Sequence, residues 1–374
     1  MAAPLVGILG AYGAVGSVAA RRLAAEGRCR LRLGGRALEP ARRLAAELGP
    51  SAEAQAQAVD AQDGQSLAAF AGECRVVLNC AGPAYLLLDR VRQAAFAAGA
   101  DYVDVMDDGT ASAPGGPRIA VLSAGLVPGL SGLLPGLLAA TMARPLRFTG
   151  GYAGLGALTH TGAVDYLLSL DRGFGVPMGL WRGRTVPGAL RTDDGVRVPG
   201  LPRPVTAVPF LTAEVVERAE ALGLEEARWY NAFDGSFLYD ALNRVRTGDG
   251  PDLDAHAAEL VRAGALDAAG RTPYHALWGS LDGIGHEGAE VRRTVLIRGA
   301  DGSELTGEVG AFAVSEVCSG RVPAGVHRAA EALSPRRVVD RLRAVVGGLV
   351  VAERDAEAAS GAELVDEAEE EGAL

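Results

Sequence analysis

The chain has 374 residues, enough for two domains, and 49% of them are hydrophobic, so a sizeable core can form. No apolar run reaches the roughly 18 residues that a membrane span needs, and the amino terminus lacks a basic start, so we expect neither a signal peptide nor a membrane partner. The net charge of −10 lies mostly in the last residues, which leaves the body of the chain near neutral and argues against a nucleic-acid surface.

Residues 4 to 125 alternate short apolar runs with amphipathic stretches. The apolar runs predict strands at Leu5–Leu9, Leu31–Gly34, Gln57–Val59, Val76–Asn79, Tyr102–Val105 and Ile119–Leu122. The stretches between them predict helices at Val15–Glu26, Leu38–Leu48, Gly64–Ala71 and Tyr85–Ala98. Strands separated by helical patterns of this length indicate βαβ units, so we expect an α/β fold with a Rossmann-type doubly wound parallel sheet.

The pattern changes after Pro128. A loop leads into an apolar helix in which Pro135 marks a start or a kink. Glycine-rich strands are expected from Phe148 onward, then a helix at Ala163–Leu170 and an irregular stretch at 172–208. This part of the chain therefore predicts a second domain of a different type.

Strong alternation of apolar and polar residues returns late in the chain. Residues 290–299 and 305–318 are expected to form antiparallel strands joined by an Ala-Asp-Gly-Ser turn. Near 334–345, Ser334 at the N-cap and Pro335 in the first turn predict an amphipathic helix. We expect an α+β domain with a mixed or antiparallel sheet, inserted before this last helix.

These patterns divide the chain into three parts. A dinucleotide-binding domain comprises residues 1–127 together with 321–347, and a substrate and dimerisation domain comprises 128–320. The tail at 352–374 carries nine acidic residues and a single arginine, and it has too few apolar residues to fold alone. We expect it to be a disordered or frayed extension.

Three glycines follow the first expected strand directly. Gly10, Gly13 and Gly16 are spaced three apart and open the first helical pattern, which is the context that the dinucleotide-binding fingerprint requires. The first glycine allows a tight turn, the second allows the backbone to approach a diphosphate, and the third allows the helix to pack closely on the sheet. The helix N-terminus then favours the negative charge.

The end of the second strand distinguishes between the two nicotinamide dinucleotides. Sites for NAD carry an acid there for the ribose hydroxyls, but this strand ends in Gly35 and Arg36. A planar guanidinium binds a 2′-phosphate well, and Arg42 or Arg43 can assist from the next helix. The sequence therefore favours NADP(H).

Further contacts are expected from the third and fourth strands. Asp60 follows the third strand and is placed to meet the adenine edge, and the loop after the fourth strand lies where ligands bind in parallel sheets. Cys80 in that loop has no histidine nearby and is interpreted as structural rather than nucleophilic. The predicted cofactor-binding residues are Gly10, Tyr12, Gly13, Ala14, Val15, Gly16, Arg36, Asp60, Asn79, Cys80, Ala81 and Gly82.

The motifs together resemble the saccharopine dehydrogenase-like oxidoreductases. The resemblance rests on GAYGAVG, on GGR after the second strand, on NCAGPA, AGADYVDV and AGLVPGLSGLLPG, and on the closing VPAGVHRAAEALSPRRVVDRL. It implies a Rossmann domain with an inserted α+β domain, and nicotinamide-linked chemistry at a carbon–nitrogen bond. Carried over to this chain, it implies that the cofactor is lined by Gly10, Gly13, Gly16, Arg36, Asp60, Asn79, Ala81 and Gly82.

The chain departs from the family pattern after YVDV. Many members continue with threonine, glycine and glutamate, whereas this chain continues with Met-Asp-Asp-Gly. Either Asp107 or Asp108 replaces the acid, or the substrate differs. The middle domain does not resemble that of a lysine-pathway enzyme, which argues against saccharopine itself as the substrate.

The composition limits the chemistry. All 36 basic residues are arginine, so neither a Schiff-base lysine nor a Tyr-x-x-x-Lys pair is possible. Reduction of an imine needs a proton donor near the nitrogen, and our first candidate is His160, with Tyr152 and Asp165 beside it. His160 could equally be a surface or capping histidine.

Two further residues and the cysteines complete the candidates. His327, in the closing loop, could also face the cleft. Tyr85, after the fourth strand, could contact the substrate or could equally be a core aromatic. The four cysteines have no paired spacing, so we expect no metal site and no disulfide framework.

We therefore expect an NADP(H)-dependent oxidoreductase that reduces a C=N bond, or oxidises C–N in reverse, in a small amino-acid-derived or specialised metabolite. The alternatives are a C=C or C=O reductase and a non-catalytic NADP-binding sensor, because the Rossmann half does not distinguish acceptors. A small molecule is the expected partner, in a cytoplasmic homodimer.

Overall fold

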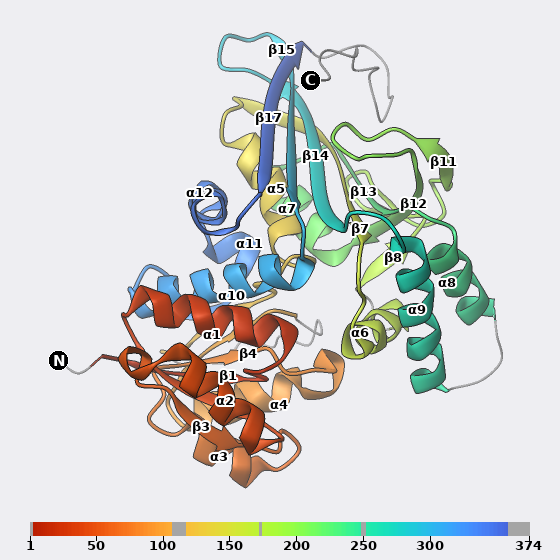
Figure 1. Cartoon of the computed structure of the whole chain (residues 1–374). Coiled ribbons are helices and arrows are strands. Elements are labelled where there is room, and N and C mark those ends of the chain that lie inside the picture. Colours follow the sequence, from red (N-terminus) through yellow and green to blue (C-terminus); the bar gives the residue numbers. More distant parts are fainter. Residues whose placement is uncertain (1–2, 107–116, 172–173, 248–251, 358–374) are drawn as a thin grey trace. The chain divides into compact units, whose positions relative to one another are not determined.

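The chain forms two compact units in the computed structural model, which describes residues 3–106, 117–171, 174–247 and 252–357 (Figure 1). The first unit comprises Met1–Leu133, Thr159–Phe174 and Asp301–Gly347, and the second comprises Leu134–Leu158, Gly175–Ala300 and Gly348–Leu374. No helix in the described part of the chain is both long and apolar enough to cross a bilayer.

The first unit is built on a seven-stranded sheet in the order β16-β6-β5-β4-β1-β2-β3, and every neighbouring pair is parallel. The strands are β1 (Leu5–Leu9), β2 (Arg30–Gly35), β3 (Gln55–Ala58), β4 (Val76–Asn79), β5 (Asp101–Asp104), β6 (Ile119–Leu122) and β16 (Gly325–Arg328). The order reverses between β1 and β4, and ligands of open parallel sheets bind at such a point, outside the carboxyl ends of the strands.

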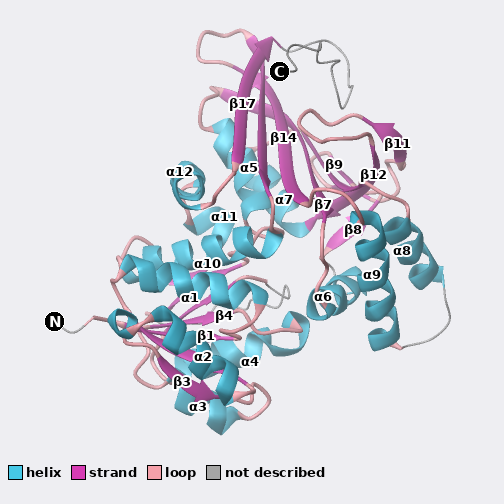
Figure 2. Ribbon diagram, in the orientation of Figure 1, coloured by secondary structure: helices cyan, strands magenta, loops and turns pink. Residues whose placement is uncertain are grey.

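Helices cover both faces of this sheet, as Figure 2 shows. The helix after β1 (α1, Ala14–Glu26) packs against α10 (Gly302–Cys318). The helices before and after β4 pack against each other. The helices are α1 (Ala14–Glu26), α2 (Leu38–Leu48), the 3-10 turn η1 (Pro50–Ala52), α3 (Gly64–Ala71), α4 (Ala84–Ala97), α6 (His160–Asp171), α10 (Gly302–Cys318), α11 (Ala329–Ala332) and α12 (Pro335–Val345). Helix α5 (Leu130–Ala139) begins in the first unit and ends in the second.

The core under α3 depends on one aromatic ring. Phe70 is fully buried beside β1 and β2, and a Cβ at Gly34 would lie 2.5 Å from its Cε2 atom. Glycine at this position, and at Gly7 of β1, lets the ring lie against the backbone of the sheet. This approach fixes α3 and therefore the loop that connects β3 to it.

The second unit contains a ten-stranded mixed sheet whose main path is β10-β9-β13-β7-β14-β15-β17. Strands β13 and β7 are parallel, while β14, β15 and β17 continue the sheet by antiparallel pairing. The strands are β7 (Arg144–Leu155), β8 (Gly175–Pro177), β9 (Leu180–Trp181), β10 (Thr185–Val186), β11 (Asp193–Val196), β12 (Val205–Thr212), β13 (Glu226–Phe233), β14 (Tyr274–Ile284), β15 (Glu290–Gly299) and β17 (Val350–Glu357). The helices are α7 (Ala213–Leu222), α8 (Phe237–Thr247) and α9 (Leu253–Ala268).

The predicted fold class is confirmed. The parallel sheet with helices on both faces and the second, mixed sheet are both present. The bounds of β1, β4, β6, α2 and α3 agree with the sequence prediction residue for residue, and the other predicted elements before residue 125 differ by one or two residues at their ends. The 3-10 turn η1 was not predicted.

The predicted strand at 305–318 is wrong, because these residues belong to helix α10. The helix packs against α1, α12, β4 and β5, so most of its residues are buried and small or apolar. Its buried Glu308 accepts two hydrogen bonds from Arg22 Nε, at 2.9 and 2.8 Å. Charged residues inside an otherwise apolar segment produced the alternation that resembled a strand.

The domain bounds also differ from those expected. Helices α6 and α10 cluster with the first unit, although both lie within the predicted substrate domain. Residues 350–357 form β17 and pair with β15, so the first residues of the predicted disordered tail are part of a sheet. Pairing with a neighbouring strand supplies the order that this acidic segment lacks by itself. The rest of the predicted tail lies outside the described residues.

We expect Gly307→Ala to destabilise the protein, because a Cβ there would lie 2.7 Å from the backbone oxygen of Val15 on α1. Overpacking of this kind costs about 1–3 kcal/mol, so thermal unfolding should show a lower Tm. Gly64→Ala is the matched control, since a Cβ at that helical position would meet nothing within 4 Å. An unchanged Tm for Gly307→Ala would contradict the packing of α1 on α10.

Candidate nucleotide and proton-transfer site

The turn between β1 and α1 can be formed only by glycine at two positions. Gly10 has a φ of +76°, and a Cβ there would lie 2.7 Å from the backbone oxygen of Cys80. A Cβ at Gly16 would lie 2.2 Å from the backbone oxygen of Gly10. The turn therefore packs against both its own helix and the loop after β4, which is what the fingerprint requires.

The N-terminus of helix α1 presents backbone N–H groups that can bind an anion. Gly13 is its N-cap and provides no side-chain hydrogen bond, so the first backbone N–H groups, beginning at Ala14, are not capped by a side chain. Gly13 and Ala14 are exposed. A diphosphate fits this end because the N–H groups point outward and the helix dipole favours negative charge.

The turn is held against the end of β2 by backbone hydrogen bonds. The N–H groups of Gly10 and Ala11 donate to the carbonyl of Gly34, at 2.9 and 3.0 Å. Arg36 follows two residues later, and its side chain is exposed. The strand end therefore offers a cation and no carboxylate to a ribose, which fits a 2′-phosphate.

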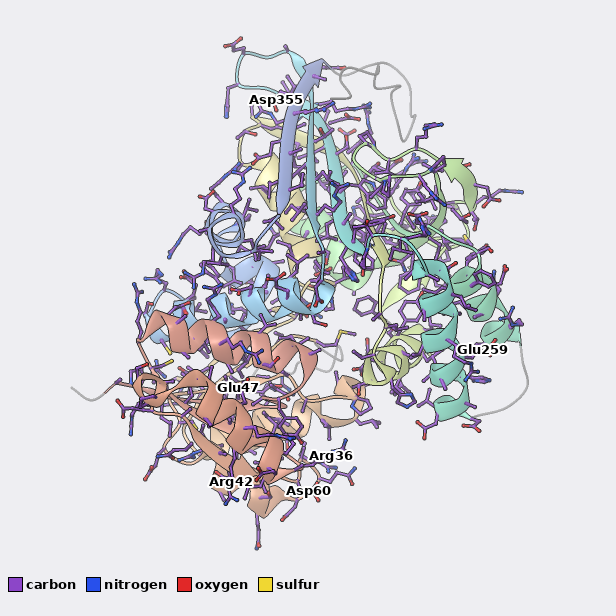
Figure 3. The ribbon with its side chains drawn as sticks, in the orientation of Figure 1. Arg36, Arg42, Glu47, Asp60, Glu259 and Asp355 are labelled. Carbon is purple, nitrogen blue, oxygen red and sulfur yellow. The ribbon has the colours of Figure 1, made fainter. Side chains whose placement is uncertain are left out.

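The end of β3 lies beside the end of β2, because Val59 N donates to Gly35 O at 2.9 Å. Asp60 comes next and is exposed, and its Oδ1 accepts from the backbone N–H of Gln62 at 2.9 Å. Figure 3 shows Asp60, Arg36 and Arg42 in the region of α2 and β3. The structure thus brings the predicted adenosine-side residues together.

Asn79 shapes the loop after β4 through its buried side chain. Its Oδ1 accepts from Ala81 N at 3.1 Å, and its Nδ2 donates to the Tyr102 hydroxyl at 3.2 Å. Burial raises the pKa of the neighbouring Cys80 thiol to about 12. Cys80 is therefore a thiol near neutral pH, as expected for a structural cysteine.

Asp165 on α6 contacts the loop after β4. Its Oδ1 accepts from Ala84 N, in the first turn of α4, at 2.6 Å. Pro83, the N-cap of α4, supplies no side-chain hydrogen bond, so Asp165 caps that helix from a distant part of the chain. On the other side, a Cβ at Gly82 would lie 3.1 Å from Asp165 Oδ2 and 2.5 Å from Thr161 Cγ2.

The environment of Asp165 changes its ionisation. Burial raises the pKa of its carboxyl to about 6, and hydrogen bonds from the backbone N–H groups of Ala84 and Tyr85 oppose that rise. A carboxyl with this pKa is mostly ionised at neutral pH but keeps a larger protonated fraction than an ordinary aspartate does. Asp165 can therefore act as a proton donor or acceptor next to the nucleotide-binding loop.

His160, the first sequence candidate, is the first residue of α6 and is exposed. The N-terminus of this helix is capped by Thr159, whose Oγ1 accepts from Gly162 N at 3.0 Å. His160 and Asp165 are five residues apart, so they project about 140° apart around the helix axis. Thr161, four residues before Asp165, shares the face that meets Gly82.

Tyr152 belongs to β7 in the second unit, and its hydroxyl lies 2.7 Å from His275 Nδ1 on β14. Gly154 makes room for this pair, because a Cβ there would lie 2.5 Å from the Tyr152 hydroxyl. Burial raises the pKa of Tyr152, so the phenol is neutral. Sequence reasoning did not single out His275, because the pairing depends on strand register.

The remaining candidates have these positions. His327 lies on β16, with Nε2 3.2 Å from Pro323 O. Tyr85 is buried in the first turn of α4. Asp107 and Asp108 lie outside the described residues. In the part of the chain that the structure describes, no group of His, Cys, Asp or Glu is arranged to hold a metal ion, and all four cysteines are free.

A family model and several solved structures are similar to part or all of this chain. Residues 6–117 match the family model described as the saccharopine dehydrogenase NADP binding domain. No curated protein is significantly similar to the chain. Apo saccharopine dehydrogenase (L-Glu forming) from Saccharomyces cerevisiae superposes with a TM-score of 0.68 at 15% identity, over 94% of this chain and 100% of that one. An alcohol dehydrogenase from the archaeon Thermococcus sibiricus, complexed with 5-hydroxy-NADP, gives a TM-score of 0.24 at 20% identity, over 28% and 58%.

The structural match shows that both units share the fold of the yeast enzyme. The family model identifies the dinucleotide of the first unit as NADP(H), as the sequence predicts. Residues 6–117 are therefore similar to the saccharopine dehydrogenase NADP binding domain.

Proposed function

We propose that the protein is an NADP(H)-dependent oxidoreductase that reduces a C=N bond, or oxidises the C–N bond in reverse, in a small amino-acid-derived or specialised metabolite. The observation that carries this proposal is the Asp165 carboxyl, which lies against the loop after β4 with its pKa raised to about 6. The fold shared with saccharopine dehydrogenase (L-Glu forming) supports a dehydrogenase that acts on an amino-acid-derived substrate.

In the proposed reaction the bound cofactor supplies the hydride that adds to carbon. In its protonated form, the Asp165 carboxyl would deliver its proton to the imine nitrogen. The C=N π bond breaks, one C–H and one N–H bond form, and Asp165 is left as a carboxylate. In the oxidative direction the same carboxylate accepts the proton from nitrogen.

Other residues of the chain would bind and orient the cofactor. The glycine turn and the N-terminus of α1 would hold the diphosphate, and Arg36 would hold the 2′-phosphate. Asn79 fixes the backbone of the loop that Asp165 contacts, through its bond to Ala81 N. Tyr152 and the homodimer stay predictions, and so do the alternatives of C=C or C=O reduction and a sensor role.

We expect Arg36→Ala to weaken binding of NADPH by about 10- to 100-fold, the cost of losing a hydrogen-bonded ion pair. Binding of NADH should change little, since it lacks the 2′-phosphate. Titration calorimetry with both cofactors measures this. Arg28→Ala, an exposed arginine at the opposite end of β2, is the control of equal charge. Equal losses for NADPH and NADH would contradict the role of Arg36.

We expect Asp165→Asn to lower the rate of NADPH-dependent imine reduction by about 10²- to 10⁴-fold while NADPH still binds. The amide oxygen can still accept from Ala84 N, so α4 stays capped. The reduction rate of the wild-type protein should fall as pH rises above about 6, the pKa to which burial raises Asp165, and this dependence should vanish in the variant. Stopped-flow kinetics with a panel of cyclic imines and ketones checks both points.

The folded state binds the Asp165 proton more tightly than the unfolded chain does, because the pKa rises from 3.8 to about 6 on folding. Stability due to this group is therefore lost as pH rises from about 4 to about 6. At pH 7 the Tm of Asp165→Asn should equal or exceed that of the wild type. Asp63→Asn, which alters the acid that caps α3, is the control for this stability measurement.

For the reaction itself, an unaltered reduction rate in Asp165→Asn, or an equal loss of rate in His160→Ala, would remove Asp165 from its role as proton donor.

A further inference from the structure

Tyr12 lies in the glycine turn, but its side chain contacts the end of the next strand. The phenol ring packs on Gly35, where a Cβ would lie 2.3 Å from Tyr12 Cε1. Its hydroxyl accepts a hydrogen bond from the backbone N–H of Ala37 at 3.0 Å. Tyr12 therefore contacts the residue before Arg36 and the residue after it.

These contacts fix the backbone from which the Arg36 side chain projects. Ala37 is the N-cap of α2, so its backbone N–H lies before the first turn of the helix. Its side chain provides no capping hydrogen bond. The Tyr12 hydroxyl gives that N–H an acceptor, and the ring limits the movement of Gly35. The exposed guanidinium of Arg36 thus projects from a residue that is held on both sides.

The diphosphate turn does not depend on the Tyr12 hydroxyl. That turn is held by the bonds from Gly10 N and Ala11 N to Gly34 O, and all three of these groups belong to the backbone. Removing the hydroxyl should therefore loosen the residues that would bind the 2′-phosphate and leave the turn beneath the diphosphate in place. Discrimination between two cofactors that differ by one phosphate is sensitive to such a change.

We propose that Tyr12 is a positioning residue that sets the preference of this protein for NADP(H) over NAD(H), by holding Gly35 and Ala37 so that Arg36 meets the 2′-phosphate. The proposal rests on the 2′-phosphate role proposed for Arg36. It assigns to the phenol a selectivity function in addition to its place in the glycine turn.

The experiment compares Tyr12→Phe with the wild type by titration calorimetry, using NADPH, NADH, 2′,5′-ADP and 5′-AMP. A side-chain-to-backbone hydrogen bond contributes a modest net free energy, so we expect NADPH and 2′,5′-ADP to bind about 3- to 10-fold more weakly. Binding of NADH and 5′-AMP should be unchanged. Equal weakening of all four ligands, or no weakening of any, would overturn the proposal.

A second measurement needs no ligand. Amide hydrogen exchange at Ala37 should be faster in Tyr12→Phe than in the wild type, because its N–H loses its acceptor. Tyr239→Phe, which removes a hydroxyl from α8 in the second unit, should change neither exchange at Ala37 nor any of the four affinities. Unchanged exchange at Ala37 in Tyr12→Phe would show that the hydroxyl does not hold this turn, and would overturn the proposal.

The double variant Tyr12→Phe with Arg36→Ala separates this inference from the function it rests on. If Tyr12 acts through Arg36, Tyr12→Phe should produce no further loss of NADPH affinity once Arg36 is absent. A selective effect of Arg36→Ala without one of Tyr12→Phe would overturn the inference and leave the cofactor site intact. No preference for NADPH in the wild type would overturn both.

Discussion

The candidate site depends on the close approach of the backbone turn after β1 to the ends of two other strands. The turn donates two hydrogen bonds to Gly34 O at the end of β2, and Gly10 lies against the backbone of Cys80 after β4. No side chain beyond hydrogen fits at Gly10 or Gly16 without moving the backbone. This one contact brings the N-terminus of α1, the loop carrying Arg36 and the loop beneath Asp165 into the same part of the first unit.

Asp165 shows how one contact can serve structure and chemistry together. Its carboxyl accepts from Ala84 N and so caps a helix that lacks a cap of its own. The burial that accompanies this contact raises its pKa to about 6, into the range where a proton can be exchanged. The first unit therefore holds both its nucleotide-binding elements and an ionisable group, although α6 lies far along the chain from the Rossmann strands.

The elements of the first 125 residues could be predicted because the strands and helices of each βαβ unit have distinct patterns of apolar and polar residues. Strands buried on both faces give short apolar runs, and the helices between them give amphipathic patterns. Helix α10 could not be read in this way, since it is enclosed by α1, α12 and the sheet and has no wide polar face. Strand β17 was missed for the opposite reason, because an acidic segment is ordered there by pairing with β15.

The geometry of the glycine turn was predictable because one motif carries one role, whereas the role of Arg36 stays a prediction. Contacts between distant segments were not readable. Nothing in the sequence indicates that Gly35 leaves space for the Tyr12 ring, that Gly154 leaves space for the Tyr152–His275 pair, or that Asp165 reaches Ala84. These contacts depend on register and packing, which emerge only when the elements are placed together.

A crystal structure of the complex with NADP⁺ would show whether an NADP(H) site and a proton donor meet in the first unit. We expect the 2′-phosphate within hydrogen-bond distance of the Arg36 guanidinium and the nicotinamide ring on the side of the loop where Asp165 lies. A 2′-phosphate bound away from Arg36, or a nicotinamide ring remote from Asp165, would contradict this expectation.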